Sequence, residues 1–505
     1  MERRILKYVI CMVCGAVLPG CSEMGVGTSE APPLFAFDEV WVREDAMRQW
    51  GESKNEMYAD AYGREAVEAD TALLWVSAMG VDSQADTLIE CLRRVGDEGL
   101  SGETFHVGEI VEAVDSLRAL AVEGQTCEGA DELLAQVEFQ LTHAMMRYVY
   151  GQRYGYVLPH KVLNNLLLDA DAKGKRYRQL FDIPCDVPTD SLARVAFESV
   201  REGTLGWLLN EVQPRGALHE RLSAEYRRAV DAGDTARARL ARVNLERSRW
   251  RYQRPDTGLY LWINLADMML TAVDTRRDTS FMMKVCCGSM GHKSPMLMSQ
   301  VKSMEFNPYW VVPQTIVRSE IAGRHSGDSA YFARNRMVAI DKKTKEEVDA
   351  RTLSTAQLLS AGYTIRQEKG AGNSLGRIAF RFPNNFSVYL HDTNQPWAFR
   401  RERRTVSHGC IRLERPYDLA VFLLGERPSE LYVDRIRMTI GKQPLSEAGR
   451  RLKESGAQPL RSHSFKERAG LWIDYYTLYV DREGELREAA DTYGYDGAIE
   501  GGMLR

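Results

Sequence analysis

Two short segments bring together residue types that can carry out nucleophilic catalysis. His391 ends a run of alternating apolar and polar residues, and Cys410 lies further on in the string Ser407-His-Gly-Cys-Ile-Arg412. A cysteine attacks a carbonyl as its thiolate, so the thiol needs an imidazole base or a positive charge nearby. His391, His408 and Arg412 are candidates for supplying both. The pattern predicts a cysteine–histidine site for acyl transfer.

The residues around the cysteine also predict how a reaction intermediate would be stabilised. Gly409 allows the backbone to approach a ligand closely. Backbone amides of the turn at Gly409 and Cys410 can then donate hydrogen bonds to a tetrahedral oxyanion. In an expected strand over 386–391, Ser387, Tyr389 and His391 share one face, because successive side chains of a strand alternate. Tyr389 is therefore a candidate for an additional donor.

Other interpretations of these residues stay open at this point. His391, His408 and Cys410 could be three ligands of a zinc ion, although no fourth ligand is evident. A lone cysteine is also often a buried, inert side chain. Four arginines stand between the two motifs, and they form either a solvated surface or a site of attraction for a carboxylate-rich substrate. These arginines are Arg400, Arg401, Arg403 and Arg404.

The N-terminus predicts export from the cytoplasm. A basic start is followed by an apolar run over 8–18 that is too short to span a bilayer. The run ends in Leu18-Pro-Gly-Cys21, which resembles a bacterial lipobox, so residues 1–21 are expected to be a lipoprotein signal peptide with Cys21 as the lipidated residue. The polar stretch 22–33 is expected to be a tether. An ordinary signal peptide with an incidental Cys21 is the alternative.

Residues 34–250 have the periodicity of helices. Apolar residues recur at helical spacing in 88–95, 134–148 and 218–230, and a charged stretch covers 237–251. No motif in this region carries chemistry, and His143 is expected to be an ordinary core histidine. We therefore expect a helical scaffold domain.

After Pro255 the period changes from that of a helix to that of a strand. Short runs over 259–265, 281–287, 378–382 and 386–391 are rich in branched and aromatic residues, and a hairpin is expected over 471–485. Two long polar stretches interrupt these strands, at about 319–372 and 440–468, and the first is a candidate for a lid over the site. Residues 255–505 are thus expected to be mostly β, and the chain as a whole α+β.

Composition narrows the class of partner. The 505 residues contain 66 Lys and Arg against 70 Asp and Glu, a formal net charge of -4, so the charge balance does not favour nucleic acid as a partner.

The chain has nine cysteines, and two of them precede Cys21 in the expected signal peptide. Cys21 and Cys410 have expected roles, and the adjacent pair Cys286 and Cys287 cannot readily bond to each other. Five cysteines remain without an assigned role, an odd number, so at least one is unpaired within the chain.

The motifs together resemble a known family. His391-Asp-Thr393 followed by Ser407-His-Gly-Cys-Ile-Arg412 is similar to the signature of L,D-transpeptidases with a YkuD-like catalytic domain, and further strings resemble its larger YcbB-type members. These strings are Val243-Asn-Leu-Glu-Arg247 with Trp250, Asn307-Pro-Tyr-Trp310 with Val312-Pro313, Arg366-Gln367, Asn373-Ser-Leu-Gly376, Phe382-Pro-Asn384, Tyr475-Tyr-Thr477 and Asp491-Thr-Tyr-Gly494. The resemblance covers about 35–497.

The resemblance implies a fold and a reaction. A helical scaffold would precede a mainly β catalytic domain over 255–505, and an inserted capping subdomain would cover the site. Cys410 would be the nucleophile and His391 its base, while Ser407, His408 and Gly409 would shape the loop and oxyanion hole. Tyr389 would line that hole, and Arg412 would hold the loop or a substrate carboxylate.

The implied substrate is peptidoglycan. Such enzymes attack the residue at position 3 of a tetrapeptide stem, release the terminal D-Ala and form 3→3 cross-links, without a metal or other cofactor. Their thiolates are typically acylated by carbapenems. The implied location is the periplasmic side of a bacterial envelope, with a lipid anchor in a membrane. Attachment or release of a wall-linked protein at the same site, or a non-catalytic wall-binding scaffold, are the alternative functions.

Overall fold

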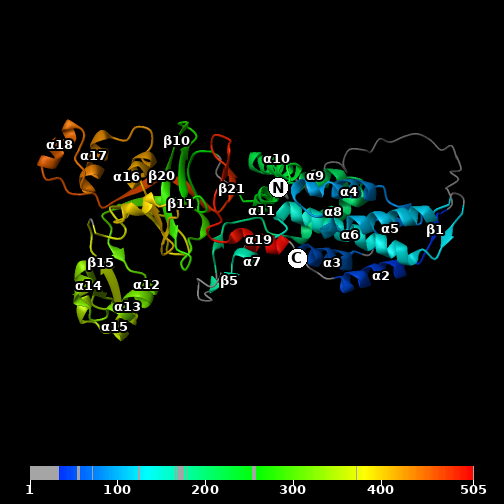
Figure 1. The fold of residues 1–505 in the computed structure, drawn as a ribbon, viewed down its shortest axis with the longest axis horizontal. Coiled ribbons are helices and arrows are strands. Elements are labelled where there is room, and N and C mark those ends of the chain that lie inside the picture. The colour runs from blue at the N-terminus through cyan, green and yellow to red at the C-terminus, as the bar shows by residue number, and fades with distance from the viewer. Residues whose placement is uncertain are drawn as a thin grey trace, which may run out of the picture.

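The structure is a computed structural model of the chain. It describes residues 33–53, 57–70, 72–122, 125–164, 166–167, 176–177, 179–252, 257–370 and 372–503. The expected signal peptide with Cys21, and the expected tether except for its last residue, lie outside these residues. The described chain forms an elongated molecule with helices at one end, a sheet in the middle and a smaller unit beside the sheet (Figure 1).

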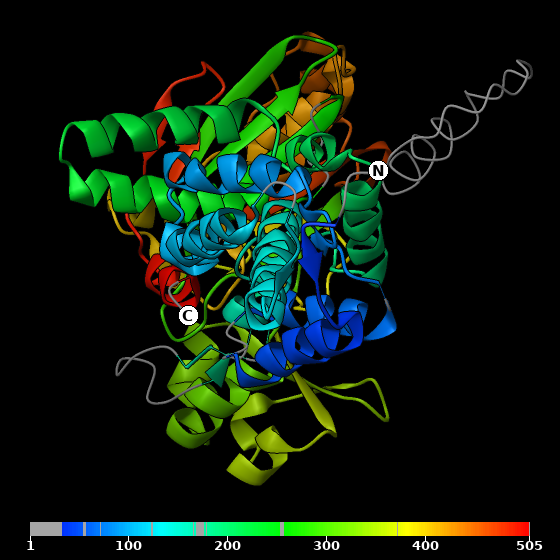
Figure 2. The same ribbon diagram turned by 90° about the vertical axis from the view of Figure 1, so that its right-hand side faces the viewer.

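The N-terminal region is a bundle of helices. α6 (Asp131–Tyr154) runs through its middle, and every residue from Leu141 to Tyr154 is buried, as expected for a helix surrounded by others. Figure 2 views the bundle from its end. The helices around α6 are α2 (Glu39–Glu52), α3 (Tyr58–Ala69), α4 (Gln84–Arg93), α5 (Val107–Leu120), α8 (Asp190–Arg201) and α9 (Leu205–Glu211). The helices predicted from residues 88–95 and 134–148 correspond to α4 and α6.

Short elements complete this region. Two-residue strands pair as β1 (Phe35–Ala36) with β4 (Cys127–Glu128), β2 (Val76–Ser77) with β3 (Gly80–Val81), and β5 (Leu166–Leu167) with β6 (Arg176–Tyr177). A short helix α7 (Pro159–Leu163) follows α6, and two antiparallel helices, α10 (Ala217–Asp231) and α11 (Thr235–Arg249), end the region. The stripe at 218–230 therefore forms a helix as well.

A buried carboxylate inside the bundle is paired with basic side chains. Asp60 of α3 accepts two hydrogen bonds from Arg147 of α6, both at 2.8 Å, and lies 3.2 Å from the ring of His143. His143 is thus buried in the core of the bundle, as its position in the helix predicted. These contacts satisfy charges that would otherwise be costly to bury.

The C-terminal region is built on one sheet that closes on itself. Its strands follow the order β16, β17, β19, β10, β9, β8, β20, β11, and β11 pairs again with β16. Their bounds are β8 (Leu259–Asn264), β9 (Met269–Asp274), β10 (Thr279–Gly288), β11 (Met296–Phe306), β16 (Ile378–Arg381), β17 (Leu390–His391), β19 (Ile411–Leu413) and β20 (Ser462–Asp474). The short β18 (Thr405–Ser407) pairs with β10. The prediction of a helical region followed by a β-rich region is confirmed.

The first long interruption folds as a separate small unit. Its sheet has the order β12 (Trp310–Val311), β15 (Tyr363–Gln367), β13 (Met337–Asp341), β14 (Glu347–Val348), and its own apolar core. Helical segments cover it: α12 (Gln314–Ile316), the π-helical turn η4 (Val317–Ile321), α13 (Ala322–His325), α14 (Ser329–Arg334) and α15 (Thr355–Leu359). The unit begins at about residue 310, ahead of the expected start at 319, because β12 supplies its edge strand. We refer to 310–367 as the cap.

The second interruption is helical only in its first part. After α16 (Pro416–Leu423), the helices α17 (Glu430–Thr439) and α18 (Glu447–Glu454) pack as a pair, joined by backbone bonds from 445–446 to the Asp434 carboxylate. From Ser462 the chain is already in β20, so the expected stretch 440–468 overlaps the main sheet. The expected hairpin over 471–485 is likewise displaced: β20 ends at Asp474, and the hairpin is β21 (Leu478–Val480) with β22 (Leu486–Glu488).

The helical and sheet regions are joined by several elements. The short strand β7 (Phe181–Asp182) leaves the helical region and pairs with β11 of the main sheet. Leu478 of β21 packs with Leu222, Ala241 and Leu245 of α10 and α11. The last helix, α19 (Tyr495–Met503), lies near α7 (Figure 1). Among the described residues, no helix combines the length and apolarity that a membrane crossing requires.

Candidate functional site

Two neighbouring parallel strands position the segments that carry the predicted catalytic residues. β17 lies between β16 and β19, with Leu390 opposite Ile411 and His391 opposite Arg412. The Ile411 amide donates to the Tyr389 carbonyl at 3.0 Å. Cys410 directly precedes β19, so this register brings the thiol to the strand that carries His391.

Strand β10 holds both sides of the segment that carries Cys410. Thr405 and Ser407 of β18 lie opposite Cys287 and Gly288, and Arg412 of β19 lies opposite Cys286. Since β18 runs parallel to β10 and β19 runs antiparallel to it, the chain must reverse between Ser407 and Ile411. We call residues 407–410 the nucleophile loop, after the predicted role of Cys410.

The reversal has a specific backbone conformation. Gly409 has φ of +107°, a conformation that side chains with a Cβ rarely adopt. The Ser407 hydroxyl donates to the Cys410 carbonyl at 2.5 Å and accepts from the Gly409 amide at 3.2 Å. Ser407 therefore closes the loop on itself, and the Gly409 amide is engaged inside the loop.

The environment of Cys410 keeps its thiol protonated. Burial raises the pKa of the Cys410 thiol above its ordinary value. The Tyr389 amide, which hydrogen-bonds the sulfur, and the charges of Arg381 and Arg412 act in the opposite direction without cancelling it. The Cys410 side chain is thus a neutral thiol at neutral pH.

His391 is held as a neutral base. It is buried, and burial lowers the pKa of its imidazole to about 3, with the charges of Arg412 and Arg381 adding to the effect. Its Nδ1 lies 2.5 Å from the Asp392 carbonyl oxygen. Because a carbonyl only accepts, Nδ1 must carry the proton and Nε2 must be the basic nitrogen.

The strand that carries His391 is shorter than expected. The expected strand over 386–391 was wrong for its first four residues, and β17 comprises Leu390 and His391 alone. The Asn384 side chain accepts from the amides of Phe386 and Val388 at 3.0 and 3.1 Å, and Ser387 has φ of +56°. These bonds form a turn in place of the ladder, so alternation there does not define two faces.

Tyr389 contributes to the site through its backbone. Its amide contacts the Cys410 sulfur and its carbonyl binds Ile411, while its ring lies against the Arg381 guanidinium with 4.2 Å from Cζ to the ring centre. Arg381 in turn pairs with Glu305 at 2.7 Å. The predicted role of the Tyr389 hydroxyl as an oxyanion donor stays a prediction.

His408 connects the nucleophile loop to the cap. Its Nε2 binds Glu320 of η4, and its ring lies 4.5 Å from that of His292, centre to centre. A cap residue therefore touches the residue two positions before Cys410. The stretch expected to be a lid does contact the site.

Arg412 and the arginine run take different positions. Arg412 is half-buried and donates to the Gln395 side chain at 2.8 Å, and burial lowers its pKa. Arg404 is buried and donates to backbone carbonyls that include those of Val285 and Met268. Arg400, Arg401 and Arg403 are exposed. Arg404 therefore belongs neither to a solvated surface nor to a site that attracts a substrate, because its guanidinium binds backbone carbonyls inside the sheet.

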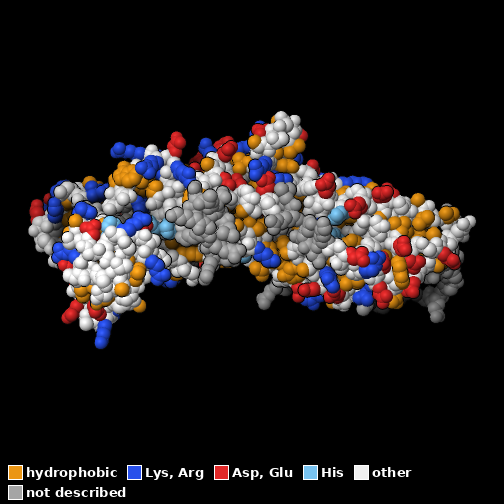
Figure 3. All heavy atoms as spheres, turned by 60° about the horizontal axis from the view of Figure 1, so that its bottom comes forward, with side chains coloured by type: hydrophobic (Ala, Val, Ile, Leu, Met, Phe, Trp, Pro, Cys, Tyr) orange, Lys and Arg blue, Asp and Glu red, His pale blue; other side chains and the backbone are white. Residues whose placement is uncertain are grey.

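Charges elsewhere on the surface are mixed. Figure 3 shows acidic and basic side chains interspersed along one face of both regions. Among the described residues, no group of three or more His, Cys, Asp and Glu side chains could hold a metal ion, so the zinc alternative finds no ligand set there. The six described cysteines are all free thiols: Cys91, Cys127, Cys185, Cys286, Cys287 and Cys410.

Sequence reasoning missed two residues that support the loop. Ser294 is fully buried and donates to the Gly409 carbonyl at 2.8 Å. Tyr493 is buried and contacts Gly288, which pairs with the loop. Only the string Asp491-Thr-Tyr-Gly494 had drawn attention to Tyr493, and no signal marked Ser294.

Comparison with known proteins is consistent with this geometry. The model of the YkuD family, described as an L,D-transpeptidase catalytic domain, matches residues 258–430. The model of a scaffold domain matches residues 67–225. A protein of Haemophilus influenzae, provisionally named an L,D-transpeptidase, is 25% identical over 217 residues, which is 43% of this chain and 40% of that protein. The chain thus matches less than half the length of this relative.

Proposed function

Because the chain carries a YkuD L,D-transpeptidase catalytic domain together with a scaffold domain, we propose that it is a peptidoglycan L,D-transpeptidase that acts through Cys410. The observation that supports this most directly is the register of β17 and β19, which brings Cys410 to the strand of His391. The tautomer of His391 adds to it, since the Nδ1 contact with Asp392 makes Nε2 the basic nitrogen.

In the first half-reaction, the Cys410 sulfur attacks the carbonyl carbon of residue 3 in a tetrapeptide stem. His391 Nε2 takes the thiol proton as the carbon–sulfur bond forms, and then gives it to the amine of the leaving D-Ala. The carbon–nitrogen bond breaks, and a thioester remains on Cys410. The starting pair is neutral on both sides, because burial raises the pKa of the thiol and lowers that of the imidazole.

In the second half-reaction, the side-chain amine of an acceptor stem attacks the thioester carbon. His391 accepts a proton from this amine and returns it to the leaving sulfur, so the enzyme is restored and a 3→3 amide bond is made. The negative charge on the oxygen of each tetrahedral intermediate needs hydrogen-bond donors. We assign this role to the Cys410 amide, because the Gly409 amide already donates to Ser407, with Tyr389 as a further donor.

A cap that contacts the nucleophile loop suits a reaction that passes an acyl group from one peptide stem to another. Glu320 of the cap binds His408 of the nucleophile loop, so movement of the cap is linked to the loop. An acyl-enzyme must meet an amine before it meets water, and a cap over the site favours this outcome. Arg412 is a candidate for binding a stem carboxylate, since a guanidinium two residues after Cys410 can donate paired hydrogen bonds to a carboxylate.

We place the protein on the periplasmic side of a bacterial envelope, anchored through a lipid on Cys21. The expected lipobox and the wall substrate support this location. Cys21→Ser is expected to move the protein from the membrane fraction to the soluble fraction of the envelope. Retention in the membrane fraction would contradict the anchor and leave the catalytic proposal intact.

Muropeptide analysis tests the reaction. Cells that express the wild-type chain should gain 3→3 cross-linked dimers, and cells that express Cys410→Ala should not. Cys127→Ala is the matched control, because it removes another half-buried thiol, in the scaffold, and should leave the dimers unchanged. Dimers that persist in Cys410→Ala would overturn the proposal.

Two further outcomes identify the alternatives. Unchanged dimers with altered attachment of a wall-linked protein would indicate that the acyl group passes to or from a protein. Purified full-length chain that forms no covalent adduct with a carbapenem at Cys410, detected by intact mass, would favour a non-catalytic wall-binding scaffold. We expect the adduct in the wild type and in Cys127→Ala, and its absence in Cys410→Ala.

A further inference from the structure

The nucleophile loop is supported from below by a turn in another part of the chain. The Ser294 hydroxyl donates to the Gly409 carbonyl at 2.8 Å and accepts from the Gly288 amide at 2.9 Å. A Cβ on Gly288 would lie 2.0 Å from the His292 carbonyl oxygen, so only glycine allows the turn at 288–294 to fold back this tightly. Ser294 is fully buried, and its hydroxyl thus links the turn to the residue next to Cys410.

A tyrosine near the C-terminus holds this turn in place. The Tyr493 hydroxyl donates to the Gly288 carbonyl at 2.7 Å and accepts from the Ser294 amide at 3.3 Å. Its own carbonyl accepts from the buried ammonium of Lys293. Tyr493 therefore contacts the turn at both of its ends, and lies two hydrogen bonds away from the Gly409 carbonyl.

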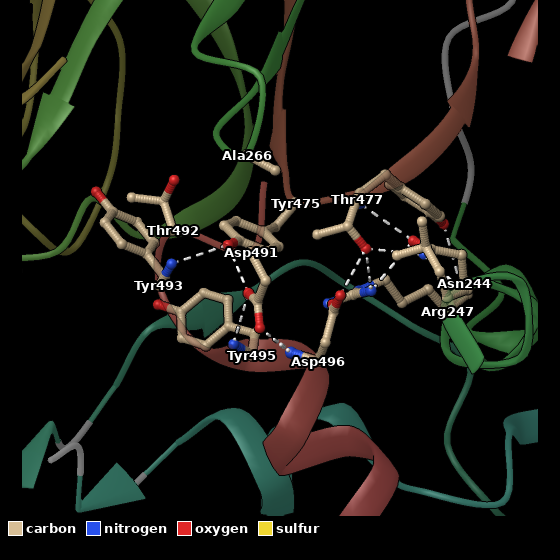
Figure 4. Close-up of polar contacts among 12 residues, drawn as sticks. Asn244, Arg247, Ala266, Tyr475, Thr477, Asp491, Thr492, Tyr493, Tyr495 and Asp496 are labelled. Carbon is tan, nitrogen blue, oxygen red and sulfur yellow. Dashed lines mark hydrogen bonds and ion pairs between the residues drawn. The ribbon is translucent and has the colours of Figure 1, made fainter. Parts of the chain in front are cut away.

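Tyr493 is itself fixed by a network that reaches the scaffold region (Figure 4). Its amide donates to the Tyr475 hydroxyl at 2.9 Å, and that hydroxyl donates to Asp491 at 2.7 Å. Asp491 also accepts from the Asp496 amide at 3.0 Å, and the Asp496 carboxylate pairs with Arg247 of α11 at 2.6 Å. The network runs from α11 to the turn under the nucleophile loop.

The network lies largely outside the matched family models. Tyr475, Tyr493 and the aspartates come after residue 430, and α11 falls between the two matched ranges. Only the end of the network at Gly288, Ser294 and Gly409 lies within residues 258–430, which match the catalytic domain model. The function proposed above gives these C-terminal residues no role, yet Tyr475 and Tyr493 are buried, and Tyr493 contacts the turn under the nucleophile loop.

We propose that Tyr493 is a positioning residue of the acyl-transfer site, which acts through Ser294 to hold the Gly409–Cys410 backbone. The proposal rests on Cys410 being the nucleophile. Acyl transfer requires the Cys410 amide to meet the developing oxyanion, and a misplacement of about 1 Å can cost about 100-fold in rate. Loss of the Tyr493 hydroxyl removes one support of the turn while Ser294 remains.

Two conservative variants of the full-length chain test the proposal, Tyr493→Phe and Ser294→Ala. Each should lower the rate constant for carbapenem acylation at saturation about tenfold, since each releases one support of the loop. Because both act on one path, the double variant should lose no more than the larger single loss. The control is Tyr479→Phe, which removes the hydroxyl of another buried tyrosine, bonded to Asp267 at 2.6 Å.

A second readout does not depend on the proposed reaction. Alkylation of Cys410 by iodoacetamide needs only an accessible thiolate, and loosening the loop exposes the buried thiol to water. We expect alkylation about fivefold faster in Tyr493→Phe and Ser294→Ala, since a thiol returned to water has a lower pKa and a larger thiolate fraction. Tyr479→Phe should match the wild type in both rates.

The outcomes separate the two proposals. Slower acylation with faster alkylation in Tyr493→Phe, at unchanged rates in Tyr479→Phe, supports positioning, because general destabilisation would affect both tyrosine variants. Acylation and alkylation rates in Tyr493→Phe within about twofold of the wild type would overturn it. If the wild type itself is not acylated, the proposed function fails, and the alkylation rates still decide whether Tyr493 holds the loop.

Discussion

Replacing Gly409 by alanine tests whether the turn before Cys410 must keep its unusual backbone. The glycine has φ of +107°, and a Cβ placed on it would meet nothing closer than the Lys293 carbonyl oxygen at 3.6 Å. Space is therefore not the obstacle, and the cost of Gly409→Ala arises from backbone strain alone.

The magnitude follows from the two ways in which the chain can respond. If the backbone keeps its φ, alanine costs about 1–3 kcal/mol. If it relaxes, the loop loses the bonds from the Gly409 amide to Ser407 and from Ser294 to the Gly409 carbonyl, at about 0.5–1.5 kcal/mol each. Both routes cost about 2 kcal/mol, and the second also displaces Cys410.

The assay compares acylation with stability. The melting temperature of the sheet region should fall by about 4–8 °C, as a loss of about 2 kcal/mol in a domain of this size implies. The carbapenem acylation rate should fall about 10- to 100-fold if the loop relaxes, since a small misplacement of the sulfur is costly.

Gly425→Ala is the matched control for this variant. Gly425 has φ of +98° with no atom near a Cβ, and it ends α16. It should show a similar loss of stability with unchanged acylation. Wild-type acylation in Gly409→Ala, with a melting temperature equal to that of Gly425→Ala, would refute the reasoning.

Three further predictions follow from charges and burial. Alkylation of Cys410 by iodoacetamide should be slow at pH 6 and rise about tenfold per pH unit up to the raised pKa of the thiol, whereas a fast rate independent of pH between 5 and 8 would reveal a preformed thiolate. Asp60→Asn should destabilise the scaffold by about 3 kcal/mol in urea titrations, because it leaves Arg147 buried without its partner; a loss under about 1 kcal/mol would contradict this. Burial opposes ionisation of Asp60, but its bonds to Arg147 outweigh this and lower its pKa, so the stabilisation is full above about pH 4 and is lost as the pH falls toward the lowered value. Glu320→Gln should change the KM for a tetrapeptide donor while unfolding free energy changes by less than about 1 kcal/mol, since its contact with His408 is partly exposed; an unchanged KM would argue against a role of the cap in substrate binding.

The sequence by itself determined the class of chemistry and the order of the two regions. Helical periodicity over 134–148 and alternation over 378–382 are local patterns, and they correctly predicted α6 and β16. Likewise, Gly409 beside Cys410 predicted a tight turn, because the conformational freedom of glycine is a property of that residue alone. These features need no knowledge of distant neighbours.

Tertiary structure decided what depends on partners far away in the chain. Alternation over 386–391 predicted a strand that forms only at Leu390 and His391, because the Asn384 side chain takes backbone bonds that a neighbouring strand would otherwise make. The burial of Arg404 could not be predicted from its neighbours in the sequence either, since it depends on carbonyls of β10 and of the turn before β9.

The support of the nucleophile loop shows the same limit most clearly. Ser294 and Tyr493 lie far from Cys410 in the sequence, and no spacing rule relates them to it. They meet because β10 carries Gly288 to the loop and the C-terminal segment returns to cover that strand end. Residue types thus determined which atoms can react, whereas the closing of the sheet and the return of the chain determined what holds those atoms in place.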